Sequence, residues 1–200
     1  MKKLFFAFII CALCACGSSK KKTENKGNGT SLDQRLSEFM QVNDEMNLEK
    51  VMDYIYPKLF TIVPREEMLE AMKSGFNNEE VKVELDSLKI DRVNPEFEMA
   101  QGRYAKISYS MVMLMDFKIS KDSIDTNGPR MVEMLAAEYG EENVSLDKAT
   151  GIIRIRTSSP MVAVKDEYAK EWSFVNLKEE DPLVNKLFSK EVLDKLATYQ

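Results

Sequence analysis

The chain of 200 residues contains no histidine, and its three cysteines, Cys11, Cys14 and Cys16, all lie near its start. Without histidine, the chain lacks the commonest metal ligand and the side chain best suited to proton transfer near neutral pH. Zinc sites of the usual His/Cys type and catalysis by Ser-His-Asp or Cys-His groups are therefore excluded. The part after Cys16 can form no internal disulfide bond, so its stability must come from a packed core.

Positive charge and long apolar runs are also scarce. The chain has 28 basic and 33 acidic side chains, and without the first fifteen residues the balance is 26 to 33, a net charge of −7. We therefore expect no nucleic-acid partner. The longest apolar run, Leu4–Ala15, would form a helix of roughly 18 Å. A bilayer core is about 30 Å thick, so this run is too short to span it.

A basic start, a short apolar segment and small residues follow one another at the beginning of the chain, as in a secretory signal peptide. The segment Leu13-Cys14-Ala15-Cys16-Gly17 resembles the lipobox of bacterial lipoproteins, although that family usually carries Ala, Ser or Thr in place of Cys14. The resemblance implies that a signal peptide, 1–15, is removed and that Cys16 becomes the lipid-modified first residue. Two or three acyl chains would then anchor the protein to a membrane, since one chain alone binds weakly. The alternatives are cleavage at another site and an inserted membrane anchor.

Residues 17–30 (GSSKKKTENKGNGT) contain no apolar side chain, so residues 16–30 are expected to form a lipidated cysteine followed by a flexible polar tether. Its mean reach would be roughly 20 Å. The three lysines at 20–22 can either lie on anionic headgroups or simply be solvated. Lipoproteins bound for the cell exterior in some bacteria carry acidic residues after the cysteine, so these lysines favour a periplasm-facing location in the cell envelope.

Residues 31–200 fit one domain by length. Apolar side chains at helical spacing predict three N-terminal helices, over about 31–43, 47–56 and 64–75. Ser31 and Asn47 are suited to cap the first two, and Gly75 to end the third. The domain is therefore expected to begin with helices.

From Val81 onward the apolar period changes from helical spacing to two, which predicts strands. The longest alternating segment, 107–117, is expected to be a central strand. A fourth helix is expected to begin at Asn127-Gly128-Pro129, to carry Met131, Met134 and Leu135 on its apolar face and to end at Gly140. Further strands are expected after it, with turns at Ser158-Ser159-Pro160 and 166–170, and then a last helix over 190–198. This order makes the domain α+β.

Helices followed by an antiparallel sheet, with FMQVNDEMNLEKVMDYIYPKLF early and EWSFVNL late, resemble the cystatin-like cone of the nuclear-transport-factor-two-like superfamily. The resemblance covers about 31–178. It implies three N-terminal helices packed on a curved antiparallel sheet, here with one inserted helix and a short C-terminal helix. It also implies a cavity at the wide end of the cone, and it allows a homodimer formed through the sheet.

In such a cone, the inward side chains of the long strand decide what the cavity accepts. We expect Tyr109, Met111, Met113 and Trp172 to line it and to bind a small apolar or amphipathic molecule without catalysis. The alternative is that these four side chains simply fill the core.

Other functions remain open at this point. An interaction module would use the open sheet face, and an enzyme would use Asp/Tyr chemistry at Asp53 or Asp116, although both aspartates fit ordinary exposed positions. Met111, Met113 and Met115 share one strand face, and thioethers select Cu(I). With no Cys or His beside them we expect no metal, and we expect no cofactor and no catalytic residue.

The lipid anchor leads to a direct prediction. The variant Cys16→Ser cannot form the thioether link to lipid, so it is expected to incorporate no labelled fatty acid and to leave the membrane fraction. Fractionation of cells fed an alkyne fatty acid measures both effects. An unchanged membrane association with undiminished label would contradict the lipobox interpretation.

Overall fold

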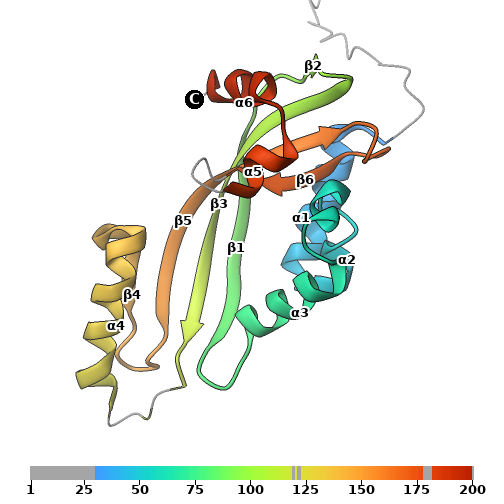
Figure 1. Ribbon diagram of the computed structural model, residues 1–200. Helices are drawn as coiled ribbons and strands as arrows, with labels where there is room; N and C mark the ends of the chain where they lie inside the picture. Colours follow the sequence, from blue (N-terminus) through green and yellow to red (C-terminus); the bar gives the residue numbers. More distant parts are fainter. Residues whose placement is uncertain (1–29, 119, 121–122, 178–181, 200) are drawn as a thin grey trace, which may run out of the picture.

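The computed structural model describes residues 30–118, 120, 123–177 and 182–199 (Figure 1). The helices of this part are α1 (Leu32–Asp44), α2 (Leu48–Val51), α3 (Arg65–Phe76), α4 (Ile124–Tyr139), α5 (Pro182–Leu187) and α6 (Lys190–Ala197), with 3₁₀ helices η1 (Pro57–Thr61) and η3 (Glu141–Asn143). Its strands are β1 (Lys82–Val93), β2 (Phe97–Met99), β3 (Gly102–Asp116), β4 (Val144–Leu146), β5 (Ile153–Lys165) and β6 (Ser173–Asn176). The α+β class is confirmed.

The signal peptide, the lipobox with Cys16 and nearly all of the expected tether lie outside the described residues. Within the described ranges, no helix is both long enough and apolar enough to cross a bilayer.

The six strands form one antiparallel sheet in the order β1-β3-β5-β4, with β2 paired to β3 and β6 paired to β5. As expected, the long strand β3 lies in the middle. It pairs with β5 without interruption from Arg103 to Met115. The three long strands bend along their length (Figure 1).

Pairing gives the sheet one apolar face over its whole length. Residues directly opposite each other point to the same side, so Leu85, Met113 and Ile155 share a face. The other face carries the intervening residues and is largely polar between the two ends, where Lys89 and Arg156 are exposed. The apolar face needs covering along its whole length, and the other face only around Tyr104, Val162 and Val164.

Two separate helical layers cover the two ends of the apolar face. At one end, Leu32 and Leu36 of α1 pack on Ile107 and its neighbours, and at the other end Leu135 of α4 packs on Ile155. The helices α5 and α6 form a third core against the reverse side of the sheet, where Tyr104, Val162 and Val164 point. Neither of these two helical layers covers the middle of the apolar face.

Several expected helices are confirmed. The hydroxyl oxygen of Ser31 accepts the backbone N–H of Gln34 at 3.2 Å, which caps α1. The third helix extends one residue past Gly75, and the C-terminal helix is present as α6.

The second helix is shorter than expected, because it ends at Val51 instead of continuing to residue 56. The backbone of 54–56 pairs with β6 instead, where the N–H of Phe174 donates to the carbonyl of Tyr54 at 2.7 Å. The N–H of Tyr56 in turn donates to the carbonyl of Phe174 at 3.0 Å. A partner distant in sequence has replaced the helical hydrogen bonds.

The turn expected at Ser158-Ser159-Pro160 is wrong, because β5 runs straight through it. Pro160 lies opposite Ser108 and accepts a hydrogen bond from the backbone N–H of Leu177 through its carbonyl. The turn expected at 166–170 is confirmed by the bond from the N–H of Asp166 to the carbonyl of Ala169.

The fourth helix begins at Ile124, before the expected Pro129, which lies inside it. Its first turns are held by packing, since Ile124 is buried and Gly128 lies against Leu146. Of the residues expected on its apolar face, Met134 is 62% exposed. The short elements β2, β4 and α5 carry too few residues for a periodic signal and were not expected.

The same change, glycine to alanine, is expected to have opposite effects on stability at Gly75 and Gly140, because the two backbone conformations differ. Gly75 lies exposed in α3 with nothing within 4 Å of an added Cβ, so Gly75→Ala should raise the free energy of unfolding by about 0.5–1 kcal/mol. Gly140 ends α4 with φ +90°, so Gly140→Ala should lower it by about 1–3 kcal/mol. Urea unfolding measures both, and shifts in the same direction would contradict the assignment.

Candidate functional site

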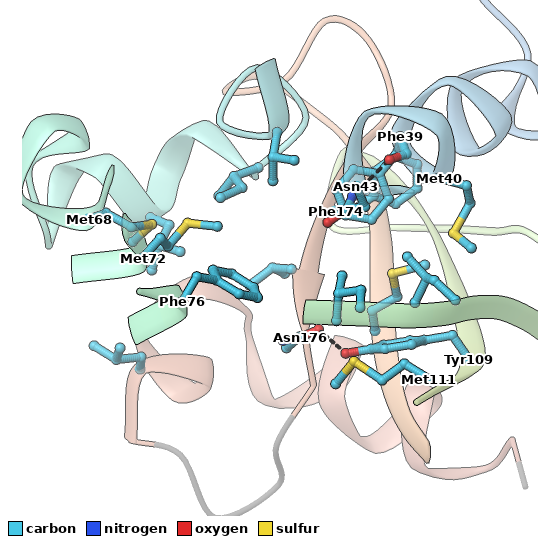
Figure 2. A pocket seen from close by; sticks show the side chains of 18 of the residues that line it. Phe39, Met40, Asn43, Met68, Met72, Phe76, Tyr109, Met111, Phe174 and Asn176 are labelled. Carbon is cyan, nitrogen blue, oxygen red and sulfur yellow. Dashed lines mark hydrogen bonds between the residues drawn. The ribbon is translucent and has the colours of Figure 1, made fainter. Parts of the chain in front are cut away.

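An apolar pocket with a volume of about 430 Å³ lies over the middle of the apolar sheet face (Figure 2). Helices α1, α3 and α5 and strands β1, β3 and β6 contribute most of its wall. Its lining residues are Phe39, Met40, Asn43, Val51, Ile55, Leu59, Met68, Met72, Phe76, Leu85, Leu88, Tyr109, Met111, Met113, Met161, Phe174, Val175, Asn176, Leu183, Val184 and Leu187. We call this space the apolar pocket.

Helix α3 forms one wall of the apolar pocket. Its side chains Met68, Met72 and Phe76 are spaced four residues apart and therefore share one face of the helix. None of the residues of α3 is buried, although the apolar stripe is continuous. A helix of this kind normally buries its stripe in the core. Here the stripe is only half-buried: Met68 packs against the core formed with α5 and α6, and all three side chains also line the apolar pocket.

Methionine dominates the lining. Six of the lining side chains are thioethers: Met40, Met68, Met72, Met111, Met113 and Met161. Methionine is unbranched and adapts its shape to what it contacts. The walls can therefore adjust to occupants of different shape.

The polar groups of the lining are few. The hydroxyl of Tyr109 donates to the Oδ1 atom of Asn176 at 3.0 Å (Figure 2). Burial raises the pKa of Tyr109, so this hydroxyl stays protonated at ordinary pH. The Nδ2 atom of Asn43 donates to the carbonyl of Phe39 in its own helix at 2.7 Å. No charged side chain occurs among the lining residues of the described chain.

Three of the four residues expected to line a cavity do line the apolar pocket: Tyr109, Met111 and Met113. Trp172 does not. It is 2% exposed, belongs to the core under α1, and has the guanidinium of Arg103 5.4 Å from its ring centroid. The stripe of α3 and Asn176 were missed as site residues, although the spacing of the methionines in α3 was visible in the sequence.

The aspartates considered for catalysis lie elsewhere. Asp53 is exposed and pairs with Arg65 at 2.6 Å, and Asp116 is exposed and accepts the backbone N–H of Lys118. Neither lines the apolar pocket. They are ordinary surface carboxylates.

A tyrosine and a carboxylate do meet outside the apolar pocket. The hydroxyl of Tyr56 donates to Oδ2 of Asp166 at 2.5 Å, while Oδ1 accepts the backbone N–H groups of Tyr168 and Ala169. The ring of Tyr56 also stacks on Phe188. Burial and the neighbouring Asp166 carboxylate raise the pKa of Tyr56. The pair fastens the turn between β5 and β6 to the helical layer.

The three methionines considered for copper do not converge on one space. Met111 and Met113 line the apolar pocket, whereas Met115 packs in the core under α4. Across the described residues, no group of three or more His, Cys, Asp or Glu side chains could hold a metal ion.

Comparison of the chain with protein-family models, with curated proteins and with solved structures gave no match.

The Tyr56–Asp166 pair gives a prediction for stability and its pH dependence. Tyr56→Phe removes a hydrogen bond to a charged group and should lower the free energy of unfolding at pH 7 by about 1.5–3 kcal/mol. The folded protein holds the Tyr56 proton above pH 10.0, where the unfolded chain releases it, so stability should fall as pH rises past that value. In Tyr56→Phe the free energy of unfolding should decrease less steeply above pH 10.0, because no Tyr56 proton is left to be released. Urea titrations at pH 7 to 11 measure it, and an unchanged alkaline slope would be evidence against the pair.

Proposed function

We propose that this protein is a lipid-anchored cell-envelope protein that binds a small apolar or amphipathic molecule in the apolar pocket, without catalysing a reaction. The observation that carries the proposal is the apolar stripe of α3, which borders the apolar pocket and is only half-buried. A volume of about 430 Å³ falls within the range of small-molecule sites, which are mostly apolar with a few polar groups. An occupant would bury both α3 and the sheet face beneath it.

We also propose that the fold is a cystatin-like cone. Three helices precede the sheet, the strands bend, and the apolar pocket lies between the two, which is the arrangement that the resemblance implies. A homodimer through the sheet stays part of this proposal.

The proposed anchor brings the site close to a source of ligand. Lipidation at Cys16 and a tether with a mean reach of roughly 20 Å would keep the domain beside the membrane. A periplasm-facing protein held there would meet amphipathic molecules from the bilayer at high local concentration.

An interaction module is less well supported. In the described part, the exposed large apolar side chains are Val93, Met134 and Tyr168, which belong to β1, α4 and the β5–β6 turn. They form no continuous stripe on one element, whereas docking surfaces usually show a contiguous patch. The apolar side chains of α3 line the apolar pocket instead.

A binding assay tests the proposal. The core residues of the described structure lie between Leu32 and Leu196, so a chain starting at Gly17 contains the whole described fold and lacks Cys16, the proposed lipidation site. This chain should bind the neutral fluorophore N-phenyl-1-naphthylamine saturably. Met72→Glu, which places a carboxylate in the wall, should weaken binding by about tenfold or more because the charge must be desolvated.

The matched control is Met134→Glu, which makes the same change on an exposed helical position outside the apolar pocket. It should leave the affinity for the fluorophore within about twofold. No saturable binding by the unmutated chain, or equal losses in the two variants, would refute the proposed function.

A further inference from the structure

We propose that the apolar pocket selects uncharged amphiphiles, with the head group held by Tyr109 and Asn176 and the hydrocarbon chain lying along the methionines. The ligand class is a single chain that ends in a hydroxyl or a carboxamide. This inference rests on the proposed function and specifies the ligand of the same site.

Within the described residues, the wall of the apolar pocket offers no counter-charge to an ionised head group. All 21 lining residues of the described chain are uncharged, although 30% of the whole sequence is charged. An ionised head group that entered this space would lose its hydration and find no ion-pair partner in the wall, so its entry is unfavourable. The free energy of desolvation is much smaller for a neutral head group.

The polar pair Tyr109–Asn176 offers neutral hydrogen-bonding groups to a head group. Tyr109 comes from β3 and Asn176 from β6, the two strands that flank β5, and their side chains meet where the pocket reaches solvent, because Tyr109 is buried and Asn176 is exposed. In their mutual hydrogen bond Asn176 uses only its oxygen, and its amide N–H groups have no partner among the described residues. The bond orients the amide, so these donors are fixed in direction.

A hydroxyl or carboxamide suits this pair. Its oxygen can accept an N–H of Asn176, and its own O–H or N–H can donate to the oxygen of Tyr109. The raised pKa of Tyr109 keeps the phenol neutral, so the pair carries no charge of its own. A carboxylate could use the donors of Asn176 but would stay without a cation.

Asn43 is the other amide of the lining, but its role differs. Its Nδ2 atom is bonded to the carbonyl of Phe39 one turn earlier in α1, so it serves the helix. Asn43 therefore provides a control for Asn176: the same residue type, in the same pocket, engaged with its own helix.

The rest of the pocket suits a chain better than a rigid ring system. Six thioether side chains can follow a flexible hydrocarbon, and they provide no further polar contact. The head group should therefore govern affinity more strongly than small changes in tail length or branching.

The test compares three ligands that share one tail. On the chain starting at Gly17, 1-decanol, decanoate and decylamine are used at pH 8 to displace N-phenyl-1-naphthylamine. Decanol should bind about tenfold or more tightly than the two ionised amphiphiles. Equal displacement by all three would overturn this inference while leaving the proposed function intact, whereas failure of the fluorophore itself to bind would remove both.

Substitutions then assign the head-group site. Asn176→Leu should lower the affinity for decanol by about three- to tenfold. The variant should still bind the fluorophore, which shows that the pocket is intact. Asn43→Leu should leave the ratio of decanol to decanoate affinity unchanged. A ratio that responds to Asn43→Leu and not to Asn176→Leu would overturn the assignment.

A charge substitution gives a gain that loss of folding cannot imitate. Asn176→Asp keeps the shape of the side chain and puts a carboxylate beside Tyr109. The affinity for decylamine relative to that for decanol should rise by about tenfold or more, because the ammonium group now meets a counter-charge. An unchanged order of affinities in this variant would contradict a head group at Asn176.

Discussion

The uninterrupted pairing of β3 with β5 is the constraint on which the rest of this structure depends. Because no bulge shifts this register between Arg103 and Met115, every second residue of β3 stays on one side. That side is apolar over a length greater than one helix covers. Helix α1 protects one end and α4 the other. The apolar pocket lies where the two layers leave the face uncovered, bordered by α3.

Most charged side chains lie on the outer surface, away from the apolar sheet face and the apolar pocket. Ion pairs such as Arg65–Asp53 and Arg154–Asp86 lie on the outside, and the strong Tyr56–Asp166 bond fastens a turn. The wall of the apolar pocket keeps only hydrogen-bonding groups that are neutral. This separation matches a site that sorts molecules by hydration cost, because the entering group exchanges water for a weakly polar surrounding.

The sequence allowed the local parts of this arrangement to be predicted. Alternation over 107–117 indicated the central strand, and the residues Tyr109, Met111 and Met113 follow from its inward side. The contacts between distant segments could not be predicted. Residues 54–56 leave the helix because β6, more than a hundred positions later, supplies their hydrogen bonds. Trp172 faces the core under α1 and not the pocket for a similar reason, since the position of α1 decides which aromatic side chains are covered. Pro160 lies within a strand because its carbonyl has a partner in Leu177.

The half-buried stripe of α3 has a thermodynamic consequence. A helix whose apolar stripe is only half-buried gains less from tertiary packing, which is the main source of helix stability in proteins. A guest in the apolar pocket would supply the missing contact surface. Ligand binding and the folding of α3 would then be coupled: binding would stabilise the helix, and a stable helix would raise the affinity for the ligand by the same free energy. Protection of the backbone amides of α3 from solvent exchange would therefore report occupancy, even for a guest with no spectroscopic signal of its own.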